Sequence, residues 1–486
     1  MSTLSDSATP EKTFLGQPRA LAHLFGVEMW ERFSFYGMQG ILLLYLYYGV
    51  AEGGLDIPKA TAAGIVGAYG GGVYLSTVLG AWIADRLLGS ERVLFFSAIV
   101  IMVGHVSLAL LPGIPGVATG LILIAIGSGG LKASATSVVG SLYTPEDPRR
   151  DGGFSLFYLG INLGAFAGPI LTGLLQKNWG FHFGFGLAAV GMAAGIIQYS
   201  LGRKELPPAA RIVPNPLPRR SWPLAGGIAA AVIAGIVVLV ATGVITADNL
   251  VTIVISVTIV VAIGYFLLIL ANRQVTPIER KRVYAFIPMF IASTGFWSLY
   301  MQQFTVVTIY ADERLNLSLF GWQMPIPWVQ SITPIFVILL SGVFAAVWTK
   351  WGTAQPSTPL KFAAGTAIMG VAFLLFLPFA GGGENSTPLL ALVAILFVFV
   401  VAELLLSPVG LSIATKLAPK VFETQMVALF FLSIALGTAI SGKLAEWYTI
   451  ADEALYFSVL GGVAIGLGLL LALIARPVVK LMGGVR

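Results

Sequence analysis

The sequence has no cysteine and only three histidines among its 486 residues. It can therefore form no disulfide, and His23, His105 and His182 are too scattered along the chain to indicate a metal site. We expect His105 to be a neutral, hydrogen-bonded packing residue rather than a proton carrier. A phosphate-binding P-loop is also missing, because the three glycines at 70–72 are not followed by Gly-Lys-Ser/Thr. We expect neither a metal nor a cofactor, no ATP hydrolysis, and no enzymatic activity.

Charged residues are scarce as well. Only 10% of the residues are Asp, Glu, Lys or Arg, compared with about 25% in soluble domains, and 57% are hydrophobic. Apolar runs of about 20 residues or more, long enough to cross a bilayer as helices, occur fourteen times. We therefore predict an all-α polytopic membrane protein with 14 transmembrane helices. The runs are 23–50, 60–84, 93–111, 117–141, 153–175, 181–202, 222–244, 249–271, 284–309, 326–348, 360–379, 388–415, 424–447 and 454–476.

The positive charges indicate the orientation. They are scattered in short loops rather than gathered on one face, which argues against nucleic-acid binding despite the net charge of +6. With a cytosolic N-terminus, 22 of the 28 Lys and Arg residues fall in cytosolic segments. Residues 1–20 are polar and have no apolar core that would indicate a cleavable signal peptide. We predict a monomeric, multi-pass protein of the plasma (cytoplasmic) membrane, held in the lipid bilayer with both termini in the cytosol.

The order of the apolar runs divides the chain into six, two and six. The middle pair carries no charge between Trp222 and Ala247, which is typical of lipid-facing helices outside a working bundle. Six plus six resembles the major facilitator fold, in which two halves rock about a site near the membrane midplane. The predicted segments are a tail (1–22), an N-terminal bundle (23–202), a Pro-rich linker (203–221), two accessory helices (222–272), a second linker (273–283), a C-terminal bundle (284–476) and a tail (477–486).

The loop between the second and third runs supports the same resemblance. Gly80, Asp85, Arg86 and Gly89 resemble the conformational loop of the major facilitator superfamily, in which a glycine precedes Asp-Arg-x-x-Gly. An ordinary tight loop with a capping Asp is the alternative interpretation.

A charged turn opens the first apolar run. In a helix Glu28 lies i,i+3 from Glu31 and i,i+4 from Arg32, so the three share one face. An ionisable group at the centre of a membrane helix costs at least ~2.5–3.5 kcal/mol, and less toward the ends. We interpret this turn as part of a proton or substrate path, in which a substrate carboxylate competing for Arg32 triggers proton uptake or release. A structural ion pair or a helix-end marker is the alternative.

Two more ionisable residues fall near the middle of their runs. Lys132 belongs to the N-terminal half and Glu403 to the C-terminal half, and both have small residues or proline nearby. A cation in one half and an anion in the other predict a cavity with two poles, which a zwitterion such as a peptide could bridge. A Lys132–Glu403 salt bridge without a ligand role is the alternative, and a bridge that substrate breaks would combine both.

Polar and aromatic residues add candidates for the cavity wall. Asn162 lies inside an apolar run and either binds a ligand amine or peptide bond, or joins two helices by hydrogen bonds. Tyr36, Tyr74 and Trp297 suit the wall of a pocket for varied side chains, because aromatic faces supply area without a fixed hydrogen-bond pattern. Packing or an interfacial belt remains the alternative for each aromatic.

At these positions the sequence resembles the proton-dependent oligopeptide transporter (POT) family, in its prokaryotic branch. Residues 28–36 match the first-helix Glu-x-x-Glu-Arg-Phe-x-Tyr-Tyr motif except at position 35, and 157–164 match the fifth-helix signature. Lys132 and residues 403–411 match elements of the fourth and tenth helices. These motifs occur in the family's order.

The resemblance implies proton-driven import of di- and tripeptides, and of peptide-like drugs, by alternating access. It implies proton coupling through Glu28, Glu31, Arg32, Lys132 and Glu403. It implies a peptide carboxylate facing Arg32 and Lys132, and a peptide amine facing Asn162 and Glu403. The implied substrate pocket consists of Arg32, Tyr36, Tyr74, Lys132, Asn162, Trp297, Thr333, Glu403, Ser407, Phe430 and Ser433.

The sequence departs from the family pattern at five positions. Phe35 replaces a motif Tyr, Gln39 a frequent Arg, Met301 the usual glutamate, Thr333 a common Asn, and Phe430 a frequent Trp. Without the acid at 301, proton coupling must depend on the first-helix turn and Glu403. The alternatives are a transporter of the same fold for nitrate or another small anion, and an uncoupled peptide facilitator or sensor.

Overall fold

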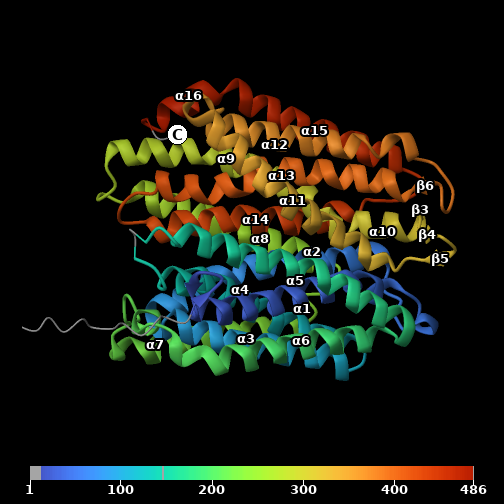
Figure 1. Ribbon diagram of the computed structural model, residues 1–486, viewed down its shortest axis with the longest axis horizontal. Coiled ribbons are helices and arrows are strands. Elements are labelled where there is room, and N and C mark those ends of the chain that lie inside the picture. The colour runs from blue at the N-terminus through green and yellow to red at the C-terminus, as the bar shows by residue number, and fades with distance from the viewer. Residues whose placement is uncertain (1–12, 145–146, 485–486) are drawn as a thin grey trace, which may run out of the picture.

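The computed structural model describes residues 13–144 and 147–484, so part of each predicted tail lies outside the described residues (Figure 1). The helices are α1 (Ala20–Tyr47), α2 (Lys59–Ile83), α3 (Ser90–Leu110), α4 (Gly113–Gly140), α5 (Arg150–Trp179), α6 (Phe181–Gly202), α7 (Trp222–Ala241), α8 (Leu250–Ala271), α9 (Pro277–Tyr300), α10 (Val306–Glu313), α11 (Ile332–Trp351), α12 (Thr358–Leu374), α13 (Leu389–Leu417), α14 (Glu423–Ala445), α15 (Glu453–Leu473) and α16 (Ala475–Leu481).

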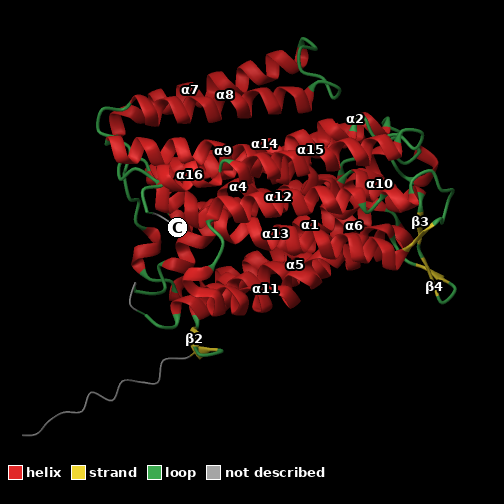
Figure 2. Ribbon diagram, turned by 90° about the horizontal axis from the view of Figure 1, so that it is seen from above, coloured by secondary structure: helices red, strands yellow, loops and turns green. Residues whose placement is uncertain are grey.

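Short strands lie outside the helical bundle. β1 (Thr13–Phe14) pairs with β2 (Gln17–Pro18) and β4 (Ser318–Leu319) with β5 (Trp322–Gln323), both antiparallel, whereas β3 (Leu315–Asn316) and β6 (Thr387–Pro388) are parallel. The long helices run side by side along the molecule. One end, here called the α16 end, carries β2 and α16, and the opposite end, the α10 end, carries α10 and β3 to β6 (Figures 1 and 2).

Thirteen of the described helices are long and apolar enough to cross a membrane. The remaining long helix, α1, has 28 residues but is less apolar, because it carries the charged turn. Most of α1 is buried against α5 and α6, so its polar groups need not face lipid. With α1, the helices account for the 14 predicted spans.

The long helices other than α7 and α8 form two halves. In the N-terminal half α1 packs on α5 and α6, and α4 packs on α2 and α3; in the C-terminal half α12 packs on α13 and α15, and α14 on α9. The halves meet where α2 crosses α14 and where α5 meets α11. Gly67 and Gly442 lie at the first crossing, where a methyl group on Gly67 would be 2.4 Å from the Gly442 Cα. Small residues there let two membrane helices approach at backbone distance.

The accessory pair lies outside both halves. None of the residues of α7 is buried, whereas α8 packs on α2 and α14 (Figure 2). Packing of α8 therefore holds the pair beside the crossing of the two halves, and the charge-free surface of both helices suits lipid.

The structure moves three predicted boundaries. The ninth helix begins at Pro277 rather than in the region of 284, because Thr276 and Glu279 form a capping box, so Arg280, Lys281 and Arg282 are helical and not part of a linker. Its continuation to 309 is also interrupted: a 3₁₀ turn, Met301–Phe304, separates α9 from α10. The C-terminal tail begins with the short helix α16, which packs on α9 and α12.

Candidate functional site

A cavity of about 360 Å³ lies between the two halves. It is lined by side chains of α1, α2, α4 and α5 on one side and by α9, α11, α13 and α14 on the other. The predicted residues that line it are Glu28, Arg32, Tyr36, Tyr74, Lys132, Asn162, Trp297, Thr333, Glu403, Ser407 and Phe430. The fold thus gathers into one place residues that are up to about 400 positions apart in the sequence.

Arg32 lies between two buried carboxylates of its own helix. Its Nη2 is 2.6 Å from Glu28 Oε1, and its Nε is 3.3 Å from Glu31 Oε2. Ser128 on α4 donates a hydrogen bond of 3.0 Å to Glu31 Oε1. Glu28 lines the cavity, but Glu31 lies behind it and is fully buried. Only Glu28 can therefore be displaced directly by a ligand that reaches Arg32.

The ammonium group of Lys132 lies against aromatic rings. Its Nζ is 4.5 Å from the ring centroid of Tyr74 and 4.8 Å from that of Phe35. Among the described residues no carboxylate oxygen pairs with it, so the alternative of a Lys132–Glu403 salt bridge is not realised in this conformation. Phe35, where the family has a Tyr, keeps the ring that contacts the ammonium and lacks only the hydroxyl. A cation held over aromatic faces inside a cavity is available to an anionic ligand.

Glu403 forms the opposite pole and is hydrogen-bonded within its own half. Tyr300 Oη donates to Glu403 Oε2 at 2.6 Å, which joins α9 to α13. Sequence reasoning missed Tyr300, although it precedes Met301 in the same segment. A tyrosine inside an apolar helix needs a partner for its hydroxyl, and that signal could have drawn attention to it.

Two of the residues that depart from the family pattern are uncharged at the interface. Met301 lines the cavity at the junction of α9 and the 3₁₀ turn. Gln39 is buried in α1 outside the cavity lining, and its Oε1 has no hydrogen-bond partner among the described residues. Neither residue can therefore contribute a charge at its position.

Three predictions about single residues need comment. Asn162 lines the cavity and donates to the carbonyl oxygen of Tyr158 in its own helix at 3.0 Å, so no hydrogen bond from it to a second helix is found in the described part. Ser433 is fully buried outside the cavity, where its Oγ is 2.8 Å from Ser293 Oγ, because it lies on the side of α14 that faces α9. Ser433 therefore does not line the cavity in this conformation, and its role in substrate binding stays a prediction. His105 is buried, but neither ring nitrogen has a hydrogen-bond partner among the described residues, so the expected hydrogen bond is absent.

Contacts at the α10 end close the cavity on that side. Asp312 of α10 accepts hydrogen bonds from the hydroxyls of Tyr47 and Tyr48, at 2.5 and 2.9 Å. Lys59 of α2 pairs with Glu313 of α10 beside them. These three contacts all join the N-terminal half to the C-terminal half.

Toward the α16 end the cavity continues into two further cavities. One, of about 1130 Å³, shares Tyr158, Ser407 and Leu411 with it. The other, of about 470 Å³, shares Lys132 and Phe431. The structure is thus closed at the α10 end and open toward the α16 end.

The candidate conformational loop lies at the α16 end and is covered by the first linker. Asn215 Nδ2 donates to both carboxylate oxygens of Asp85, at 3.0 and 3.1 Å, and Leu217 N donates to Arg86 O at 2.8 Å. Gly89 has φ +81°, and a methyl group there would lie 2.8 Å from Arg211 O. Asp85 accepts from the linker rather than capping a helix, so the simple capping interpretation does not apply. Gly80 instead faces Gly130 of α4, where a methyl group would lie 2.5 Å from its Cα.

The sequence profile of the POT family matches residues 91–459, which is more than half of the chain. The chain belongs to the POT family. The uncharacterized transporter YclF of Bacillus subtilis is 41% identical over 481 residues, which cover 98% of both chains. The di-/tripeptide transporter of Lactococcus lactis subsp. cremoris is 39% identical over 490 residues, covering 98% of this chain and 99% of the relative.

A solved structure of a POT-family protein has the same fold. It is a crystal structure of a peptide transporter POT variant in complex with alafosfalin, with a TM-score of 0.93, 42% identity and 98% of each chain covered. The predicted family and the predicted major facilitator fold are both confirmed by these comparisons.

Proposed function

We propose that this POT-family chain is a proton-coupled symporter that imports di- and tripeptides, and peptide-like compounds, by alternating access. The observation that carries the proposal is the division of charge across one cavity. Arg32 and Lys132 come from the N-terminal half, and Glu403 comes from the C-terminal half. A zwitterionic peptide that places its carboxylate at the first pole and its amine at the second connects the halves. A related protein named di-/tripeptide transporter supports the substrate class.

In this proposal, proton coupling depends on competition between Glu28 and a peptide carboxylate for Arg32. Glu28 Oε1 is 2.6 Å from the Arg32 Nη2, and both residues line the cavity. A peptide carboxylate that pairs with Arg32 leaves Glu28 without its cationic partner. A carboxylate without a cation is costly in the membrane interior, so Glu28 then binds a proton. When the peptide leaves, Arg32 returns to Glu28 and the proton is released. Glu31, held by Ser128, keeps Arg32 in place during the exchange.

The direction of transport follows from the predicted orientation. The distribution of the basic residues supports a cytosolic position for the α16 end and for both tails, in a protein of the plasma membrane. The structure then corresponds to an inward-open state of a monomer, closed toward the outside by Asp312 and Glu313. Peptide release occurs in this state, and reopening outward requires these contacts to separate.

An uncoupled facilitator or sensor is the second candidate. One observation favours it. Gln39 and Met301 are uncharged, whereas the family pattern has an Arg and a glutamate at these positions, so this chain lacks one cation and one acid that could take part in proton coupling. In that case the cavity would bind peptides in the same way, but the proton gradient would not concentrate them.

Dipeptide uptake by the purified protein in proteoliposomes tests the proposal. We expect uptake to be stimulated by an acidic exterior and to be abolished by an uncoupler. Uptake that is equal with and without a proton gradient identifies the facilitator. Competition by dipeptides, but not by free amino acids or nitrate, identifies the substrate class, and competition by nitrate contradicts it.

A further inference from the structure

Three buried polar side-chain atoms of residues that line the central cavity have no hydrogen-bond partner among the described residues. They are Glu28 Oε2, Trp297 Nε1 and Gln330 Oε1. Glu28 pairs with Arg32 through its other oxygen, in the exchange proposed above. The remaining two atoms are a neutral donor and a neutral acceptor, on side chains that are only 5% and 6% exposed. The transport cycle proposed above gives neither of these two atoms a partner.

Two hydrogen bonds fix the orientation of the Gln330 amide group, in the 3₁₀ turn Ile326–Ser331 that precedes α11. Gln330 Nε2 donates to Thr308 Oγ1 of α10 at 3.1 Å. Thr308 Oγ1 in turn donates to the carbonyl oxygen of Gln303 at 3.0 Å. Because a hydroxyl has a single hydrogen, Thr308 can only accept from Gln330, so the Gln330 carbonyl oxygen points away from Thr308. Its neighbour on α1 is Gly40, where a methyl group would lie 3.6 Å from Oε1.

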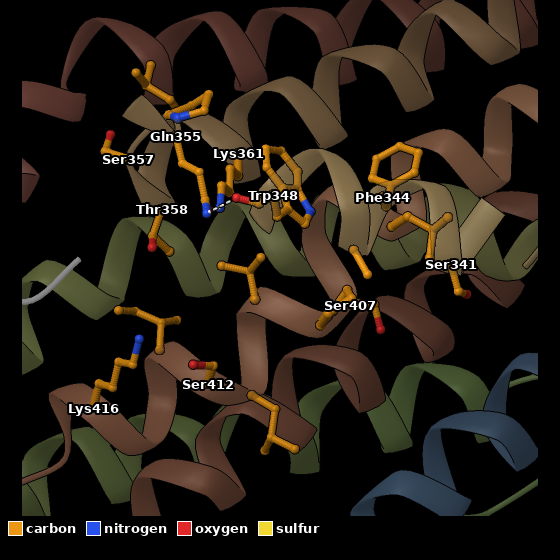
Figure 3. A pocket seen from close by; sticks show the side chains of 18 of the residues that line it. Ser341, Phe344, Trp348, Gln355, Ser357, Thr358, Lys361, Ser407, Ser412 and Lys416 are labelled. Carbon is orange, nitrogen blue, oxygen red and sulfur yellow. Dashed lines mark hydrogen bonds between the residues drawn. The ribbon is translucent and has the colours of Figure 1, made fainter. Parts of the chain in front are cut away.

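Trp297 and Gln330 lie away from the openings of the central cavity. Figure 3 shows the larger cavity toward the α16 end, which meets the central one at Ser407. Neither Trp297 nor Gln330 lines that cavity or the one of about 470 Å³. A ligand that fills the interior of the central cavity must therefore bond to these two groups itself, because a polar group left unpaired under a ligand costs free energy.

We propose that Gln330 Oε1 accepts a hydrogen bond from the N–H of the substrate's peptide bond, and that Trp297 Nε1 donates one to its carbonyl oxygen. This inference rests on the peptide transport proposed above. Arg32, Lys132 and Glu403 face the two termini of the substrate, which a free amino acid also has. A peptide bond offers one donor and one acceptor, which are the two partners that this wall lacks. Recognition of the backbone leaves the substrate's side chains unconstrained, which suits a transporter of varied peptides.

Glycylglycine and 5-aminolevulinic acid are a matched pair of probes for this assignment. They have the same termini and the same carbonyl group, but a CH₂ group in the second compound replaces the peptide N–H of the first. Competition of each compound against uptake of a labelled dipeptide, by the full-length protein in proteoliposomes, gives the two affinities. We expect glycylglycine to bind roughly tenfold more tightly, because 5-aminolevulinic acid leaves Gln330 Oε1 unpaired. Equal affinities overturn the assignment.

Gln330→Met removes the acceptor and keeps a side chain of similar length. This variant should lose the tenfold preference by weaker binding of glycylglycine, whereas 5-aminolevulinic acid should bind as before, which also shows that the variant is folded. Gln302→Met is the matched control, because Gln302 is buried, accepts from Tyr456 and does not line the cavity. It should keep the preference. The same preference in both variants overturns the assignment.

A second variant decides the question if Gln330→Met does not fold. Thr308→Val has nearly the same shape but offers Gln330 Nε2 no acceptor, so the amide orientation is no longer fixed. We expect it to lower the preference for glycylglycine several-fold, and an undiminished preference overturns the assignment. If the unsubstituted protein takes up no labelled dipeptide, the proposed function itself fails. Dipeptide uptake with equal affinities for the two probes contradicts only the role of Gln330.

Discussion

Tyr300 Oη donates a 2.6 Å hydrogen bond to Glu403 Oε2, and this contact fixes the anionic pole of the cavity between α9 and α13. A neutral hydroxyl, and not a cation, holds this buried acid among the described residues. The carboxylate therefore has no cation paired with it among the described residues and is available to a peptide amine, while its position depends on a side chain of the neighbouring helix.

Removal of this hydroxyl should weaken peptide binding. Hydrogen bonds to charged groups contribute about 1.5–3 kcal/mol, so we expect Tyr300→Phe to raise the KM for dipeptides by roughly tenfold or more. Tyr456→Phe is the matched control, because Tyr456 Oη donates to Gln302 Oε1 at 2.7 Å and does not line the cavity. Uptake kinetics in proteoliposomes measure both variants, and an equal rise in KM would remove Tyr300 from the binding role.

Loss of the charge on Glu31 should separate coupling from binding. Glu31 is fully buried, contacts Arg32 and Ser128, and does not line the cavity. Glu31 holds Arg32 where Glu28 and the peptide carboxylate exchange it, so we expect Glu31→Gln to abolish concentration of peptide by a proton gradient and to leave peptide counterflow intact. Ser128→Ala keeps the carboxylate and should retain gradient-driven uptake. Concentrative uptake by Glu31→Gln would show that coupling does not require this acid.

Lys132 should distinguish peptides by their C-terminus. Its Nζ lies over Tyr74 and Phe35 and has no carboxylate partner among the described residues, so its charge is available to a ligand. We expect Lys132→Ala to weaken binding of peptides with a free carboxylate by roughly tenfold, and of C-amidated peptides much less. Competition assays measure both, with Lys350→Ala as a control for net charge. Equal losses for the two peptide types would exclude Lys132 from the carboxylate pole.

The closed α10 end should open when Asp312 loses its charge. Asp312 accepts from Tyr47 and Tyr48 of the opposite half, and each bond to a charged acceptor contributes about 1.5–3 kcal/mol. We expect Asp312→Asn to shift the population toward the outward-open state by tenfold or more. The chain has no cysteine, so a single cysteine introduced at Met301 can report the change through labelling by a membrane-impermeant thiol reagent.

Asp452→Asn serves as the control for this experiment. Asp452 accepts a hydrogen bond from Thr449 in its own loop, and among the described residues no hydrogen bond or ion pair is found between it and the N-terminal half. Labelling should therefore stay at the level of the unsubstituted chain. Unchanged labelling in Asp312→Asn as well would mean that other contacts, such as the Gly67–Gly442 approach, hold this end closed.

The class of the protein, the 14 spans and eleven of the residues that line the cavity could be predicted from the amino-acid sequence. Long apolar runs in a chain with few charges indicate segments inside a membrane. Lipid offers the backbone no hydrogen-bond partner, so such segments are stable as helices, which satisfy their own backbone groups. An ionisable side chain inside a membrane helix is costly, so it needs a function or a partner. For this reason Glu28, Arg32, Lys132 and Glu403 could be recognised as candidates.

The partners of those residues, and which residues of a helix face the cavity, follow from the packing of the helices and could not be predicted. Tyr300 and Glu403 are 103 positions apart, so their hydrogen bond depends on how α9 packs beside α13. Ser433 falls outside the cavity because a difference of three residues from Phe430 turns its side chain toward α9. Which end is closed also depends on packing between helices. Periodicity and composition describe one helix at a time, and they contain no information about the rotation of one helix against another.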